Sequence, residues 1–122
     1  MTSNPTANAT GTPLDPQQQA ARDWFEDLRT RICAAFEAIE REAGSDASFE
    51  YIAWDREGEG ITPGPLSEGG GGGGVRGVMR GKVFEKVGVN VSTVGGEFAP
   101  DFAGQIHGAA ENPGFFATGI SL

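Results

Sequence analysis

The chain has 122 residues, enough for one domain, but its 20 glycines and 7 prolines leave a smaller part of it to form a packed core. Its net charge of −8 at pH 7 disfavours sequence-independent binding of the chain as a whole to nucleic acid or anionic lipid. One cysteine, Cys33, cannot form an internal disulfide, and no apolar run reaches the roughly 18 residues of a membrane span. We therefore expect a soluble protein of a reducing compartment.

Residues 1–15 are rich in Ser, Thr, Asn and Pro. They have neither the charged start nor the apolar run of a secretory signal, so we predict a disordered leader. The folded unit is then expected to cover residues 16–122.

The first predicted element is a helix over residues 16–43. Asp15 is a good N-cap, and Pro16 follows it at the first helical position. Gly44 is the expected stop. Acid-before-base pairs one helical turn apart, Asp27 with Arg31 and Glu37 with Arg41, are expected on the polar surface.

The apolar residues of this helix recur every three or four positions, which predicts one buried stripe. The stripe consists of Trp24, Leu28, Ile32, Phe36 and Ile39. Cys33 lies beside it and is expected to be a small buried hydrophobic residue.

The run "SFEYIAWDR" favours a strand over 49–56, with Trp54 as the largest contributor to burial. We expect Trp24 and Trp54 to anchor the core. Residues 57–74 show no periodicity and are predicted to form a long Gly/Pro-rich loop.

From Val75 onward the sequence switches to a period of two, which predicts a hairpin. Its short first strand spans 75–80, and Gly81 is the expected tight turn. The valines at positions 83, 87, 89 and 91 share one face of the longer second strand, opposite Phe84, Lys86, Asn90 and Ser92.

After a second loop, the run "ATGISL" (117–122) is expected to be a strand that ends in the middle of a sheet. One helix is followed by three or four strands, and strands and helices do not alternate as in βαβ units. This order indicates an α+β fold with an antiparallel sheet.

The motifs of nucleotide sites fail on their context. Gly72, Gly74 and Gly77 satisfy the spacing of a dinucleotide fingerprint. The fingerprint needs a strand before it and a helix after it, whereas here a loop precedes the glycines and a strand follows them. His107 is the only histidine, so a histidine-based metal site or a Ser-His-Asp relay has no support, and an exposed loop position is expected for it.

The segment 75–96 is basic within an acidic chain. It carries Arg76, Arg80, Lys82 and Lys86 against Glu85 alone. Two interpretations stay open from the residues themselves: a site for a small anion, or a solvated strand face.

The order of "WDR", a glycine run, "VFEKVGVN" (83–90) and "ATGISL" resembles the N-terminal part of the oxygen-dependent coproporphyrinogen III oxidases, most closely their alphaproteobacterial branch. The resemblance covers about residues 20–122. It implies a helix-flanked antiparallel sheet, a cytoplasmic homodimer, and a reaction of heme biosynthesis. In that reaction O₂ is the co-substrate and two propionates of coproporphyrinogen III become vinyl groups, giving protoporphyrinogen IX.

The resemblance also implies site residues. Ser121 matches the family's substrate-contacting serine, and Arg76 and Arg80 are the candidates in this chain for holding propionates. The family's proton-donating histidine, and the histidines sometimes assigned to a divalent cation, follow that serine, so no catalytic residue, metal ligand or cofactor site is expected within 1–122. The segment that matches the family's dimer contact consists of Val78, Met79, Arg80, Gly81, Lys82, Val83, Phe84, Glu85 and Lys86.

Three positions depart from the family pattern. The loop over 57–70 is about ten residues longer, four glycines become six, and Gly95 stands where a histidine is common. We assign Gly69 and Gly70 to the lengthened loop and residues 71–74 to the family motif.

The sequence leads to two alternative functions: an N-terminal part of the oxidase that is inactive alone, or a non-catalytic structural or dimerisation fragment. Neither nucleic acid nor a membrane is expected as a partner.

Overall fold

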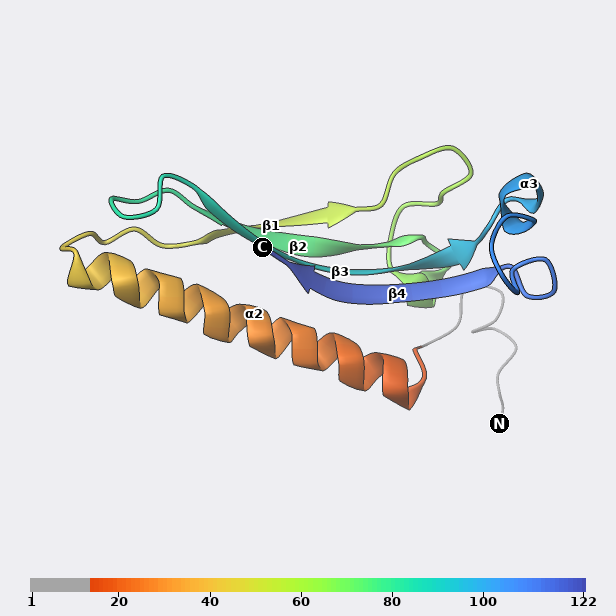
Figure 1. The fold of residues 1–122 in the computed structure, drawn as a ribbon, viewed down its shortest axis with the longest axis horizontal. Coiled ribbons are helices and arrows are strands. Elements are labelled where there is room, and N and C mark those ends of the chain that lie inside the picture. Colours follow the sequence, from red (N-terminus) through yellow and green to blue (C-terminus); the bar gives the residue numbers. More distant parts are fainter. Residues whose placement is uncertain (1–13) are drawn as a thin grey trace.

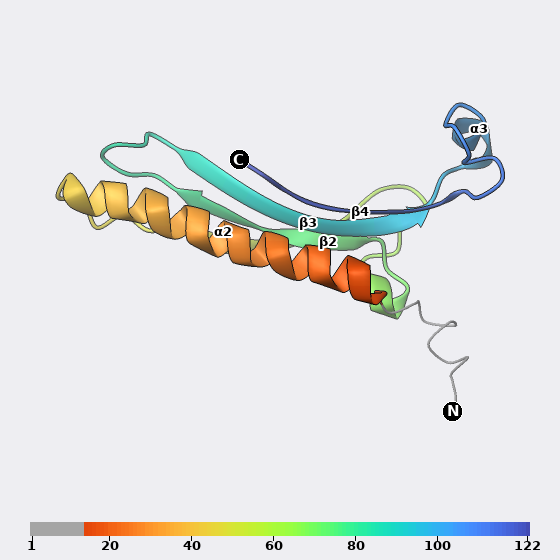
Figure 2. The ribbon, with the colours of Figure 1, turned by 60° about the horizontal axis from the view of Figure 1, so that its bottom comes forward.

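The computed structural model describes residues 14–122, and nearly all of the predicted leader lies outside the described residues. Four antiparallel strands form one sheet in the order β1-β2-β3-β4, with helix α2 along one face (Figures 1 and 2). The elements are α2 (Pro16–Glu42), β1 (Glu50–Asp55), the 3₁₀ turn η1 (Leu66–Glu68), β2 (Gly72–Met79), β3 (Val87–Glu97), α3 (Pro100–Ala103) and β4 (Gly114–Ser121). The predicted α+β class with an antiparallel sheet is confirmed.

Both predicted ends of α2 are confirmed to within one residue. Asp15 and Gln18 form a reciprocal capping box, in which each side chain accepts a hydrogen bond from the other residue's backbone N–H. At the other end Gly44 adopts φ +81°, a left-handed conformation that glycine tolerates best. Local sequence alone is enough to fix these boundaries, because every group involved lies within a few residues of the cap.

The buried face of α2 is rotated relative to the predicted apolar stripe. Trp24 is 51% exposed and Ile39 41% exposed, whereas Cys33 and Glu40 are buried. The core cluster joins Cys33 to Phe49, Met79 and Val89, and Ile32 and Phe36 pack against its edge. The burial of Cys33 is confirmed, but the two ends of the predicted stripe are wrong.

The predicted helix ion pairs have different outcomes. Asp27 and Arg31 form their pair, with 2.9 Å between Oδ2 and Nε. Arg41 instead donates to the carbonyl oxygens of Ser45 and Ala47, and Glu37 accepts from the backbone N–H of Phe49. Residues close to the end of α2 therefore bind the chain that leaves the helix rather than each other.

The predicted hairpin is confirmed as a β2–β3 pair, but its turn was misplaced. The strands are connected by residues 80–86 rather than by a tight turn at Gly81. Val83 lies in this connection and is 49% exposed, so it does not share the face of Val87, Val89 and Val91. Figure 1 shows the connection at the same end of the molecule as the end of α2.

Strand β2 begins at Gly72, so the last three glycines of the run belong to the sheet and not to the predicted loop. A Cβ atom on Gly73 would collide with the carbonyl oxygen of Trp54 in β1, and one on Gly74 with the carbonyl oxygen of Val91 in β3. Glycine is required at these two positions because β1 and β3 approach β2 too closely for any side chain.

The final predicted strand is confirmed and is longer than expected, since β4 starts at Gly114. It follows a loop that contains α3, at the end of the sheet opposite the 80–86 connection (Figure 1). Within residues 14–122, no helix has the length and apolar character needed to cross a bilayer.

Candidate functional site

The sheet has one face toward α2 and one face away from it. Val89 and Met79 point into the core beneath α2, so their alternating neighbours in β2 and β3 lie on the other face. On that face Arg76 of β2 is opposite Asn90 of β3, and Asn90 is opposite Ser121 of β4. Strand register therefore brings three polar residues from distant parts of the sequence into one row.

This row lies in a groove of about 570 Å³ on the sheet face away from α2. The side chains that shape it come from all four strands and from the 80–86 connection: Glu50, Ile52, Arg76, Val78, Arg80, Lys86, Asn90 and Ser121. All three substrate-binding residues predicted from the sequence, Arg76, Arg80 and Ser121, line this groove.

The groove carries more positive than negative charge. Arg76, Arg80 and Lys86 line it against one acidic side chain, that of Glu50. Lys82, the remaining basic residue of the segment, is used elsewhere, because its Nζ donates to the carbonyl oxygen of Ala43 at the end of α2 (3.1 Å). Guanidinium groups bind carboxylates with two parallel hydrogen bonds, and a serine hydroxyl can add a neutral donor. The arrangement is suited to a ligand with several carboxylates.

Asn90 is held by Trp54. The indole Nε1 of Trp54 donates to Oδ1 of Asn90 (2.9 Å), which leaves the amide NH₂ of Asn90 as a donor beside the groove. Trp54 is half-buried over Gly74, and neither Trp54 nor Trp24 belongs to the core cluster. The prediction that the two tryptophans anchor the core is therefore wrong.

The Glu40 carboxylate organises the connection that carries Arg80 and Lys86. Glu40 is fully buried, and it accepts hydrogen bonds from the backbone N–H groups of Lys82 (2.8 Å), Val83 (2.9 Å) and Phe84 (2.9 Å). The hydrogen bond from the Phe84 N–H has the largest effect on the pKa of the Glu40 carboxyl. Together with the other two it lowers the pKa of Glu40 below the ordinary 4.5, against the opposing effect of burial.

The residues predicted for a dimer contact (78–86) are the last two residues of β2 and this whole connection. Met79 is 1% exposed and packs in the core, whereas Val83 is 49% exposed. Their assignment to an interface stays a prediction, with Val83 as the large apolar side chain that such a contact could cover.

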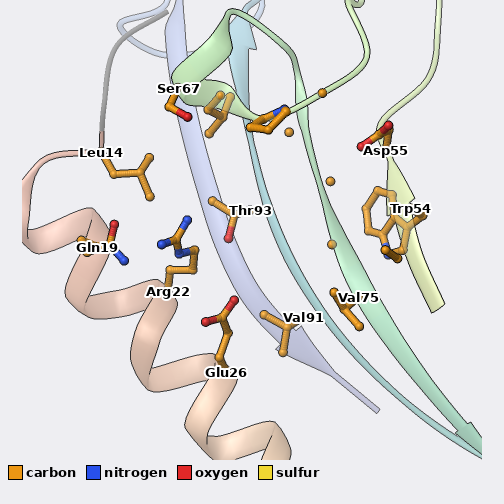
Figure 3. Close-up of a pocket in the computed structure, with 17 residues that line it drawn as sticks. Leu14, Gln19, Arg22, Glu26, Trp54, Asp55, Ser67, Val75, Val91 and Thr93 are labelled. Atoms are coloured by element: carbon orange, nitrogen blue, oxygen red, sulfur yellow. The ribbon is translucent and has the colours of Figure 1, made fainter. Parts of the chain in front are cut away.

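A second cavity, of about 470 Å³, lies between the N-terminal half of α2 and the other face of the sheet (Figure 3). Arg22 and Glu26 extend into it from α2, opposite Val91 and Thr93 of the sheet. Arg22 and Glu26 have opposite charges, so this cavity lacks the charge excess of the groove.

In the part of the chain that the structure describes, the other titratable groups do not form a metal-binding cluster. Residues 14–122 contain no group of three His, Cys, Asp or Glu side chains that could hold a metal ion. His107 is exposed in the loop after α3, as predicted. Burial raises the pKa of the Cys33 thiol, and the partial burial of Tyr51, which is still 51% exposed, raises the pKa of its hydroxyl to about 12. Both groups therefore remain protonated at neutral pH.

Sequence reasoning missed the roles of Glu40 and Asn90. The strand alternation did place Asn90 on the polar face with Lys86, so a signal for it was present. For Glu40 the signal was weaker: an acidic residue in the last turn of a helix, where the helix dipole favours cations.

The comparisons with known proteins agree on one family. The family model described as coproporphyrinogen III oxidase matches residues 20–122. The oxygen-dependent coproporphyrinogen-III oxidase of Rickettsia felis is 46% identical over 110 residues, which cover 86% of this chain and 35% of that protein. Those of Rickettsia bellii and Rickettsia akari are 46% and 43% identical over the same shares. The chain thus spans 35% of the length of these curated relatives. No solved structure gives a significant match.

Proposed function

Because the chain belongs to the coproporphyrinogen III oxidase family, we propose that it acts in the oxygen-dependent conversion of coproporphyrinogen III to protoporphyrinogen IX, a step of heme biosynthesis. Each decarboxylation releases CO₂ and leaves a vinyl group, with loss of one proton and two electrons from the propionate chain. Two such steps supply four electrons, and with two further protons these reduce O₂ to water.

The observation that carries the proposal is the row of Arg76, Asn90 and Ser121 in a basic groove, within the segment that matches the family. The propionates of the substrate are anionic, and Arg76 and Arg80 offer guanidinium groups to pair with them. The Ser121 hydroxyl donates to a carboxylate and fixes its orientation. The role of this chain is thus to hold and orient the substrate.

The proposal assigns no cofactor and no catalytic residue to this chain. O₂ is the co-substrate, and the family's proton-donating histidine and the histidines sometimes assigned to a divalent cation are expected to follow the position of Ser121. A homodimer formed through residues 78–86 and a cytoplasmic location complete the proposal.

Binding of coproporphyrin III, the stable oxidised tetracarboxylate with the same four propionates, tests the role of the groove. We expect Arg76→Gln and Arg80→Gln each to weaken binding about fivefold, which corresponds to about 1 kcal/mol for an exposed charge-assisted contact. Lys82→Gln is the matched control, because it removes the same charge from the same segment while its Nζ binds the end of α2. Equal losses in all three variants, or none, would contradict the assignment.

The alternative is a non-catalytic structural or dimerisation fragment. It is favoured by one observation, the exposure of Val83 in the predicted contact segment. This alternative predicts self-association that Val83→Ser abolishes, without coproporphyrin binding. Sedimentation of the wild type and of Val83→Ser measures self-association, and the coproporphyrin titration measures binding. The two measurements together separate the two functions.

A further inference from the structure

Glu40 and the groove lie on opposite sides of the sheet, yet the backbone connects them directly. The three N–H groups bound by Glu40 belong to residues 82–84, in the connection between β2 and β3. Arg80 lies two residues before these anchored residues and Lys86 two residues after them, and both line the groove. We call Arg80 and Lys86 the basic rim of the groove.

The anchoring constrains the backbone next to the basic rim. Arg80 stands between Met79, which is fixed in the core, and Gly81, whose N–H donates to the carbonyl oxygen of Phe84 (2.8 Å). A Cβ atom on Gly81 would collide with the Glu40 carboxylate, so helix and turn are in close contact at this point. Lys86 follows Phe84, whose N–H donates to Glu40, by two residues and directly precedes Val87, the first residue of β3.

We propose that Glu40 is a positioning residue for substrate binding: its buried carboxylate orders residues 81–84 and so places the basic rim at the groove. The inference rests on the proposed function, because it gives the rim the task of holding propionates. Ordering a binding side chain before the ligand arrives lowers the entropy cost of binding. Loss of Glu40 therefore weakens binding even in protein that remains folded.

Glu37 provides a matched control on the same helix. Its carboxylate also accepts a backbone N–H, that of Phe49 (2.9 Å), but this contact leads to β1 and not to the basic rim. Glu37→Gln and Glu40→Gln therefore make the same chemical change to an anchoring carboxylate. The glutamine at position 40 keeps one acceptor oxygen and faces the remaining N–H groups with an NH₂ group.

The experiment is a double-mutant cycle on the 122-residue chain, with coproporphyrin III binding followed by fluorescence and folding checked by circular dichroism. We expect Glu40→Gln to weaken binding at least about threefold and Glu37→Gln to leave it unchanged, and in an R80Q/K86Q background we expect Glu40→Gln to cause no further loss. An equal loss in both backgrounds, or no loss in the wild-type background, would overturn the proposal. If Glu40→Gln does not fold, Glu40→Asp is judged by the same criteria.

A ligand-free measurement separates this inference from the proposed function. In ¹⁵N NMR relaxation, Glu40→Gln is expected to increase the mobility of the Arg80 Nε–H and of the amides of 82–84, whereas Glu37→Gln does not. If the chain binds no coproporphyrin but the mobility increases, the proposed function fails and the positioning role stands. Unchanged mobility at Arg80 overturns the positioning role whatever the binding result.

Discussion

Arg76 and Ser121 lie in one row on the sheet face away from α2, with Asn90 between them, although they are 45 positions apart in the sequence. Two strand registers produce this proximity: β2 with β3, and β3 with β4. A one-residue slip in either register would turn one of the two side chains toward α2. The groove therefore depends on the same register that buries Val89 and Met79 on the other face.

Ser121 has the smallest side chain in the row of Arg76, Asn90 and Ser121, and its hydroxyl is the group proposed to contact the substrate. We expect Ser121→Ala to reduce coproporphyrin III affinity about fivefold, which is the loss of one neutral hydrogen bond worth about 1 kcal/mol. Thr118→Val is the control, because its hydroxyl bonds to Ser92 and Thr93 and does not line the groove. A larger effect from Thr118→Val than from Ser121→Ala in a binding titration would contradict the role of Ser121.

The 122-residue chain incubated with coproporphyrinogen III in air is expected to give no protoporphyrin fluorescence above the non-enzymatic rate. The reason is that the proposal assigns it substrate contacts but no proton donor. A family member of full length, assayed in parallel, shows that the substrate is competent. Turnover by this chain would show that the chemistry resides within residues 1–122.

The Glu40 carboxylate makes stability depend on pH. Its pKa is lowered in the folded state, so its contribution is complete above the ordinary value of 4.5 and is lost as pH falls through the folded-state pKa. We expect the melting temperature of the wild type to fall more steeply below pH 4.5 than that of Glu40→Gln, which has no carboxylate to protonate. Parallel melting curves for the two proteins over this range would contradict the assignment.

The close approach of strands at the glycine run predicts a large effect from a single methyl group. Gly73→Ala places a Cβ atom against the carbonyl oxygen of Trp54, and we expect a loss of about 1–3 kcal/mol in the free energy of unfolding. Gly119→Ala in β4 meets no atom within 4 Å and is expected to be neutral or to stabilise by up to about 1 kcal/mol. Urea denaturation of both variants tests the difference, and equal stabilities would argue against close strand approach at Gly73.

Gly95 and the lengthened loop are linked by packing. A Cβ atom on Gly95 would lie 3.0 Å from the carbonyl oxygen of Phe115 and 3.1 Å from Cδ2 of Leu66, in the η1 turn of that loop. We expect Gly95→His, which introduces the residue that the family resemblance predicts at this position, to destabilise the chain by about 1–3 kcal/mol. Leu66→Ala is expected to recover part of this loss in the double variant. Full additivity of the two substitutions in denaturation would show that Leu66 does not limit the space.

The sequence by itself determined the elements whose causes are local. Asp15, Pro16 and Gly44 set the ends of α2, and the alternation of Val87, Val89 and Val91 set the face of β3, because capping groups and strand period act within a few residues. Only the tertiary structure decided that Glu40 anchors the 80–86 connection, that β2 begins within the glycine run, and that Arg76 and Ser121 share a row. Those features depend on contacts between segments distant in sequence, where strand register and helix orientation decide which side chains meet.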